Sequence, residues 1–239
     1  MASAGTVRVP EGTVNIASTF GQIPSSEPHV RAIPIVFFIT GEMSDQESLK
    51  SLIASQGWQV ETFDSVREFL ARPRPLVPSC LILVRSLRDL NGVEEQKQIA
   101  RERVEVPIIV ISQHGDIPTS VEAMKAGAVD FLVSPFGDEK LLSGIHETFD
   151  RSRLALQHEM ALSHLRNCYR LLSARERQVM ALVVSGLLNK QVGAELGISE
   201  ITVKAHRGQV MRKMKANSLA DLVKMAASLW PARQTIHSA

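Results

Sequence analysis

Residues Asn189 to Met214 read NKQVGAELGISEITVKAHRGQVMRKM, and this stretch predicts two short helices joined by a tight turn. In its first half, Val192 and Leu196 recur four residues apart, the spacing of one buried helix face. Gly197 is expected to end this helix, because glycine adopts the left-handed conformation without steric cost. Ser199 stands where its hydroxyl would cap the first turn of the second helix.

The second helix is expected to have a buried face and a basic face. The inward face is predicted to hold Ile201, Val203, Val210 and Met214. The outward face combines cations with small residues: Lys204, Ala205, Arg207, Gly208, Arg212 and Lys213. A slender basic helix fits the DNA major groove, and small residues would let its backbone approach the bases. The alternative is a solvated basic face on an ordinary helical bundle.

Positive charge is concentrated at the C-terminal end of the chain. Residues 170–239 contain eleven Lys or Arg and four Asp or Glu, a net charge of +7. The first 169 residues contain sixteen Lys or Arg and twenty-one Asp or Glu, a net charge of −5. The net charge of +2 for the whole chain hides this asymmetry. Because neutralising phosphates releases counterions, a basic C-terminal region favours binding to nucleic acid.

The segment Leu172 to Met214, LSARERQVMALVVSGLLNKQVGAELGISEITVKAHRGQVMRKM, resembles the LuxR-type helix-turn-helix of the NarL/FixJ response regulators. The resemblance implies a four-helix DNA-binding domain whose first helix is capped by Ser173. Glu176 lies three residues after Ser173, as a capping box requires.

The resemblance also implies roles for individual residues. Lys204, Ala205 and Gly208 would lie against base edges, and Arg207 near bases or phosphate. The DNA backbone would be positioned by Lys190, Ser199, Thr202 and Lys213. The last helix, Ser218 to Leu229, would pair two copies on DNA through an apolar stripe that includes Leu219, Leu222, Val223 and Ala226; part of this stripe is also expected to belong to the intramolecular core.

Between Ile33 and about Arg153, short apolar runs alternate with amphipathic stretches, a pattern typical of a doubly wound α/β domain with a five-stranded parallel sheet. The expected strands are Ile33–Ile39, Trp58–Phe63, Cys80–Val84, Ile108–Ser112 and Val129–Val133. The expected helices are Asp45–Ser55, Ser65–Ala71, Gly92–Arg103, Ile117–Ala126 and one that begins at Asp138. This last helix either runs unbroken to about Arg170 or bends near Ser152 or Asn167.

The run Val106 to Phe136, VPIIVISQHGDIPTSVEAMKAGAVDFLVSPF, resembles the receiver domain of FixJ-type response regulators. The two resemblances together cover about Ile33 to Leu229. A working receiver accepts a phosphoryl group on an Asp, binds magnesium with two acids and contacts the phosphoryl group with a Lys.

This chain departs from the receiver pattern at the positions that carry its chemistry. The acid pair aligns with Thr40 and Gly41, the acceptor with Val84 and the lysine with Ser134, and only the hydroxyl position is kept, at Ser112. We therefore expect a pseudo-receiver that is not phosphorylated. The alternative is a phosphorylation switch in which Glu42 or Asp89 replaces the missing acid.

Several classes of function are disfavoured by the sequence. It holds no run of eighteen apolar residues that would span a membrane, and its start lacks the pattern of a signal peptide, so we expect a cytoplasmic protein. Cys80 and Cys168 form neither a disulfide framework nor a metal site, although a redox-sensing role for either cysteine stays open. No metal-ligand cluster or phosphate-binding glycine loop points to an enzyme or a cofactor.

The sequence thus predicts a flexible N-terminal arm (1–31), a pseudo-receiver (32–150), a helical linker (151–169), a helix-turn-helix domain (170–232) and a tail (233–239). We expect a transcriptional regulator that binds double-stranded DNA sequence-specifically as a homodimer, with the receiver-like domain acting in dimerisation or signal input. An alternative function of a different class is a protein-interaction decoy or adaptor that binds a sensor kinase or another regulator.

Overall fold

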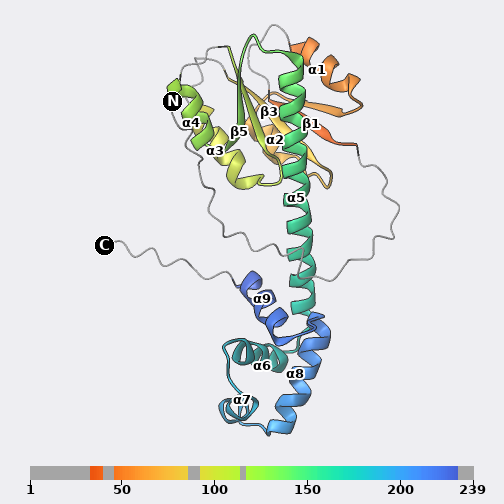
Figure 1. Cartoon of the computed structure of the whole chain (residues 1–239), viewed down its shortest axis with the longest axis vertical. Helices are drawn as coiled ribbons and strands as arrows, with labels where there is room; N and C mark the ends of the chain where they lie inside the picture. The colour runs from red at the N-terminus through yellow and green to blue at the C-terminus, as the bar shows by residue number, and fades with distance from the viewer. Residues whose placement is uncertain (1–32, 40–45, 86–91, 114–116, 231–239) are drawn as a thin grey trace, which may run out of the picture. The chain divides into compact units, whose positions relative to one another are not determined.

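The computed structural model describes residues 33–39, 46–85, 92–113 and 117–230. The described chain divides into two compact units, with the boundary after Gln157. The first unit is an α/β domain and the second consists of helices (Figure 1). None of the described helices has the length and apolar character needed to cross a membrane.

The first unit contains a five-stranded parallel sheet in the order β2-β1-β3-β4-β5. The strands are β1 (Ile35–Ile39), β2 (Gln59–Phe63), β3 (Ser79–Arg85), β4 (Ile108–Ser112) and β5 (Ala128–Val133). Their ends lie within two residues of those predicted from the sequence. The doubly wound fold predicted for this unit is confirmed, because each strand is followed by a helix and the order reverses at β1.

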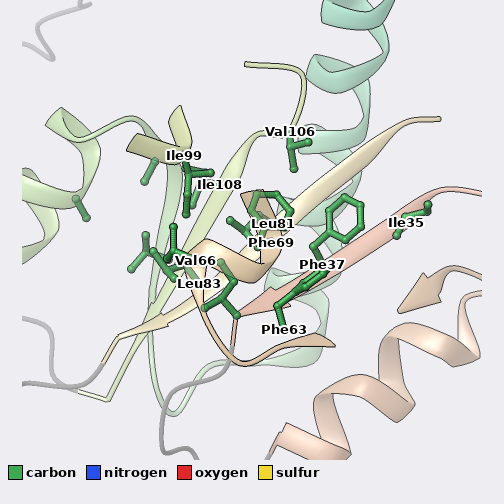
Figure 2. Packing of buried hydrophobic residues seen from close by; sticks show 14 residues of the cluster. Ile35, Phe37, Phe63, Val66, Phe69, Leu81, Leu83, Ile99, Val106 and Ile108 are labelled. Carbon is green, nitrogen blue, oxygen red and sulfur yellow. The ribbon is translucent and has the colours of Figure 1, made fainter. Parts of the chain in front are cut away.

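Helices cover both faces of the sheet. One face packs on α1 (Gln46–Ser55) and on the first half of α5 (Asp138–Arg170), and the other on α2 (Val66–Ala71), α3 (Gly92–Glu102) and α4 (Ile117–Lys125). Successive strand residues point to opposite faces, so Phe38 joins the first cluster and Phe37 the second. Phe37 contacts Phe63 and Phe69 with ring centroids 5.9 and 5.4 Å apart (Figure 2).

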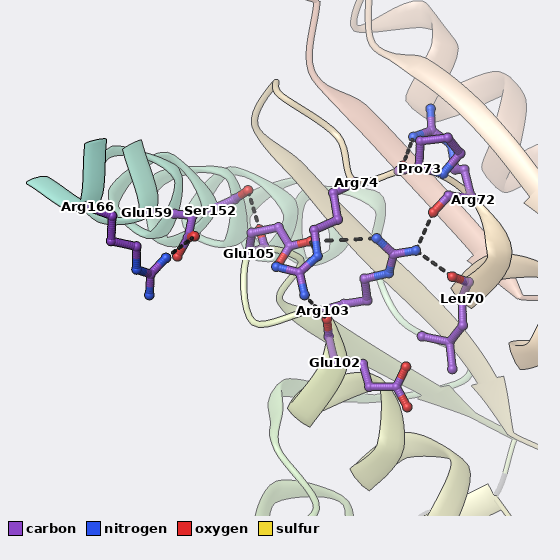
Figure 3. A network of polar contacts seen from close by, with 10 residues as sticks. All are labelled: Leu70, Arg72, Pro73, Arg74, Glu102, Arg103, Glu105, Ser152, Glu159 and Arg166. Carbon is purple, nitrogen blue, oxygen red and sulfur yellow. Dashed lines mark hydrogen bonds and ion pairs between the residues drawn. The ribbon is translucent and has the colours of Figure 1, made fainter. Parts of the chain in front are cut away.

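Helix α5 is held to the sheet by a buried hydroxyl. Ser152 is fully buried; its Oγ accepts a hydrogen bond from the Ser79 amide (3.0 Å) and donates one to the Glu105 carbonyl oxygen (2.6 Å). Beside it, the guanidinium of Arg103 donates to the carbonyl oxygen of Leu70 (2.6 Å) and lies 3.9 Å from the Glu105 carboxylate (Figure 3). These bonds fix the segments that lead into β3 and β4 against the helix.

Helix α5 runs from Asp138 to Arg170 without an interruption at Ser152 or Asn167. The segment 151–169, expected from the sequence to be a helical linker, is helical and also contributes to the cores of both units. Ser152 is buried in the α/β unit, and Leu165 and Cys168 are buried in the helical unit.

The helical unit contains α6 (Ala174–Val184), α7 (Asn189–Leu196), α8 (Glu200–Met214) and α9 (Leu219–Leu229) after the end of α5. Val203, Val210 and Met214 of α8 are buried as predicted. The prediction that Ile201 faces inward is wrong, since 79% of its surface is exposed. It lies two residues before Val203, which turns it about 200° around the helix.

Candidate nucleic-acid interface

The first helix of the helical unit begins at the predicted capping box. Ser173 Oγ accepts a hydrogen bond from the Glu176 amide (3.3 Å), and Glu176 Oε2 accepts one from the Ser173 amide (2.7 Å). The Lys213 ammonium donates to both carboxylate oxygens of Glu176, at 2.9 Å to Oε1 and 2.7 Å to Oε2, and only 5% of the surface of Glu176 is exposed. The hydrogen bond from Lys213, followed by that from the Ser173 amide, lowers the pKa of the Glu176 carboxyl. The Lys213–Glu176 ion pair therefore ties α8 to α6.

The turn between α7 and α8 is built as the sequence predicts. Gly197 has a φ of +65°, and the amide of Ile198 donates to the Gly193 carbonyl oxygen at 3.0 Å. Ser199 Oγ accepts from the Thr202 amide (3.1 Å), and their hydroxyl oxygens lie 2.8 Å apart. The predicted helix end and N-cap are confirmed.

Gly193 is a structural residue that the sequence analysis did not identify. A Cβ atom at this position would lie 2.8 Å from the Ile198 carbonyl oxygen, inside van der Waals contact. Only glycine lets α7 pack this closely against the turn. A glycine inside an otherwise regular helix was the available signal, since such a residue costs helix stability unless close packing requires it.

Two arginines hold α7 in place. Arg207 of α8 donates to the Asn189 Oδ1 atom at 3.1 Å, and Arg175 of α6 donates to the Leu196 carbonyl oxygen at 2.7 Å. Arg207, predicted to lie near bases or phosphate, is thus engaged within the unit and only partly exposed. The interactions position the start and the end of α7 relative to its neighbours.

The outward face of α8 combines cations with small side chains. Lys204, Ala205, Gly208 and Arg212 are all exposed. The Lys204 ammonium lies 3.3 Å from a Glu200 carboxylate oxygen, a weak surface pair that a phosphate or a base can displace. A Cβ atom at Gly208 would meet nothing within 4 Å, so packing within the unit does not require glycine there.

The described residues of the predicted degenerate phosphorylation pocket lie at the carboxyl ends of β3, β4 and β5. Val84 is buried among apolar neighbours and pairs in register with Ile111. The amide of Ser134 donates to the Ser112 carbonyl oxygen at 2.9 Å, which brings these two predicted residues together. Thr40, Gly41, Glu42 and Asp89 lie outside the described residues.

At these three aligned positions the side chains are an apolar group and two hydroxyls. Val84 has no atom that could accept a phosphoryl group, and Ser134 carries no positive charge to stabilise one. Among the described residues, no group of three or more His, Cys, Asp or Glu side chains could hold a metal ion.

Comparisons with protein families identify both units. A model of the response regulator receiver domain matches residues 36–146, and a model of bacterial regulatory proteins of the luxR family matches residues 170–226. Nodulation protein W of Bradyrhizobium diazoefficiens is 46% identical over 209 residues, which are 87% of this chain and 91% of that protein. The chain is a response regulator of the LuxR type.

Other similar proteins are also named as response regulators or transcriptional regulators. Response regulator protein TodT of Pseudomonas putida is 40% identical over 195 residues, which cover 82% of this chain and 86% of that protein. Transcriptional regulatory protein FixJ of Bradyrhizobium diazoefficiens is 36% identical over 191 residues, which cover 80% of this chain and 93% of that protein. The solved structure of the response regulator StyR matches with a TM-score of 0.66 at 40% identity, and covers 82% of this chain and 98% of that one.

Membership in this family establishes a two-component response regulator with a DNA-binding domain of the LuxR type. The family consists of transcription regulators, and its receiver domains interact with kinases. The degenerate pocket, the residues assigned to DNA and the homodimer stay predictions.

Two cysteines complete the set of predicted residues in this response regulator. Cys80 is fully buried in β3, and burial raises the pKa of its thiol to about 12. Cys168 is buried with its Sγ atom 3.6 Å from the His164 Nε2 atom. Burial of both thiols disfavours the redox-sensing hypothesis, because oxidants react with accessible thiolates.

Proposed function

We propose that this response regulator binds a specific duplex DNA sequence through α8, as a homodimer, and that its receiver unit works without aspartyl phosphorylation. The observation that supports this proposal is the outward face of α8. Four residues are exposed on it, two cations and two small residues: Lys204, Arg212, Ala205 and Gly208. Packing within the unit does not require glycine at position 208, and the turn before the helix is fixed by Gly197 and the Ser199 cap.

Within this proposal, Lys204, Ala205 and Gly208 lie against base edges. Lys190, Ser199 and Thr202 contact the DNA backbone from the exposed end of α7 and the start of α8. The ion pair with Glu176 gives Lys213 a role inside the unit, so we assign it a smaller part in phosphate binding than the sequence analysis did. Base contacts specify the sequence, and phosphate contacts raise affinity for all sequences.

The proposed pairing of DNA-binding units uses the exposed part of α9. Of the four predicted dimerisation residues, Leu222 and Ala226 are buried within the unit, whereas Leu219 and Val223 are about 40% exposed and lie one helical turn apart. The pair Leu219 and Val223 forms an apolar strip that a second copy would cover. Substituting both with serine should weaken binding to an inverted repeat more than binding to a single half-site.

The proposal for the receiver rests on Val84 and Ser134. An aspartyl phosphate needs a carboxylate at the end of β3 and a cation near the end of β5, and a buried valine and a half-buried serine occupy these places. The unit then keeps the receiver fold as an assembly or signal-input module.

One experiment tests both parts of the proposal. The full chain is incubated with acetyl phosphate and Mg²⁺, beside a receiver that retains its aspartate as a positive control. Intact mass is measured, and DNA binding is read by selection from random sequences. We expect an inverted-repeat site and no gain of phosphoryl mass. A mass gain that tightens binding would show that Glu42, Asp89 or another acid acts as acceptor.

Point variants separate specific binding from general attraction. Lys204→Ala is expected to lose affinity for the selected site but little for random DNA, whereas Lys213→Ala chiefly lowers the stability of the unit. Lys224→Ala, on an exposed position of α9, removes the same charge and serves as control. Equal losses on selected and random DNA for the Lys204 variant would refute its base-reading role. Tight kinase binding without any sequence preference on DNA would favour the decoy.

A further inference from the structure

Ile201 is an exposed apolar residue for which the fold gives no reason. It has 79% of its surface exposed, the largest fraction among the large apolar side chains described in the helical unit. Isoleucine is β-branched and is not favoured at an exposed helical position. Neither packing nor helix propensity therefore explains its presence in the first turn of α8.

The position of Ile201 on α8 places it at the centre of the outward face. Consecutive residues of an α-helix are rotated by about 100°. Ile201, Ala205, Gly208 and Arg212 then fall within an arc of about 60°, opposite the arc of the buried residues Val203, Val210 and Met214. Ile201 thus lies on the same strip as the small residues through which α8 would approach DNA.

We propose that Ile201 recognises a thymine through the C5-methyl group of that base in the major groove. The inference rests on the proposed function and adds a specificity-determining residue to it. Isoleucine has no hydrogen-bonding side-chain atom, so it cannot distinguish the donors and acceptors of base edges. The thymine methyl is the apolar group that B-DNA presents in the major groove, and it is the partner that an aliphatic side chain selects.

The neighbours of Ile201 fit this role. Ser199 caps the helix two residues earlier and fixes the backbone of the first turn. Ala205 and Gly208 add little or no side chain on the same strip, so the helix can come close enough for a methyl contact. Lys204, beside the strip, supplies the polar contact that an isoleucine cannot make.

The test removes the methyl groups of the DNA one at a time. The full chain first selects its site from random duplexes, and each thymine of that site is then replaced by uracil, which lacks only the C5-methyl group. We expect one position in each half-site at which this replacement weakens binding of the unmodified protein about three- to fivefold, the effect of one buried methyl group. The Ile201→Ala protein should bind the thymine and uracil sites equally.

Two variants control for indirect effects. Ile201→Val keeps a branched methyl contact and should retain sensitivity to uracil. Leu171→Ala truncates a leucine that is 67% exposed, just after the end of α5 and outside α8, and should also retain this sensitivity. Since Ile201 is exposed, its truncation leaves no cavity, and circular dichroism should show unchanged folding.

The outcomes separate the inference from the function on which it rests. If the protein selects no sequence, the proposed function fails, and the inference fails with it. If a site is selected but uracil has no effect at any position, or if the Ile201→Ala protein remains as sensitive as the unmodified protein, the role of Ile201 is refuted and the proposed function stands.

Discussion

Gly208 offers a substitution whose effects on stability and on DNA binding should have opposite signs. It lies inside α8, its φ is not positive, and a Cβ atom there would have no neighbour within 4 Å. Glycine in a helix interior is about 0.8 to 1 kcal/mol less favourable than alanine. Gly208→Ala should therefore stabilise the helical unit by about that amount, because the added methyl group enters open space.

The same substitution should weaken specific DNA binding. In the proposed complex the Gly208 backbone lies against base edges, and a methyl group would separate α8 from the groove. A loss of about 1.4 kcal/mol corresponds to a tenfold change in affinity, and the disruption of one base contact costs roughly 1 to 3 kcal/mol. We expect affinity for the selected site to fall about tenfold or more, and affinity for random DNA to change little.

Thermal unfolding of the full chain and fluorescence anisotropy with labelled DNA measure the two effects. A stabilisation of about 1 kcal/mol raises the midpoint of a domain of this size by about 4 to 8 °C. Gly193→Ala is the matched control, because its methyl group would lie 2.8 Å from the Ile198 carbonyl oxygen. Such crowding costs about 1 to 3 kcal/mol. A Gly208→Ala protein that is less stable, or that binds the selected site as well as before, would refute the reasoning.

Three further predictions concern groups buried in the two units. The lowered pKa of Glu176 means that its carboxylate stabilises the folded state at pH values above the ordinary carboxyl pKa of 4.5, and this stabilisation is lost as the pH falls through the lowered folded-state pKa. Acid should therefore lower the unfolding temperature of the unmodified protein more than that of the Glu176→Gln protein. Ser152→Ala removes the hydroxyl that bonds to the Ser79 amide and the Glu105 carbonyl, and should lower the free energy of unfolding, measured by urea denaturation, by about 1 to 3 kcal/mol. The control Ser163→Ala, on the exposed side of α5, should lower it by less than about 0.5 kcal/mol. With its thiol pKa raised to about 12, Cys80 should react with iodoacetamide at pH 8 only on unfolding, and labelling of the native protein detected by mass spectrometry would contradict its burial.

Most of the fold could be predicted because its signals are local and repeated. Unbroken apolar runs such as Ile108–Ile111 in β4 marked the buried parallel strands, and the strand ends predicted from them lie within two residues of those in the structure. The assignment of Ile201 to the inward face was wrong because it followed the residue type and not the helical angle. Ile201 and Val203 are two residues apart and cannot share a helix face. Gly193 was missed because its close neighbour, the Ile198 carbonyl, becomes visible only in the folded turn.

The sequence by itself determined the features that depend on neighbouring residues. The caps at Ser173 and Ser199 and the left-handed turn at Gly197 need partners only three or four residues away, so residue type and spacing are sufficient to predict them.

Only the tertiary structure decided the contacts between distant parts of the chain. Lys213 pairs with Glu176 across 37 residues, Arg207 bonds to Asn189 across 18, and Ser152 bonds to Glu105 across 47. A charged or polar side chain on a helix surface has many possible partners, including water and DNA. The packing of the helices selects among them, because it decides which groups are removed from solvent and must find a partner inside the protein.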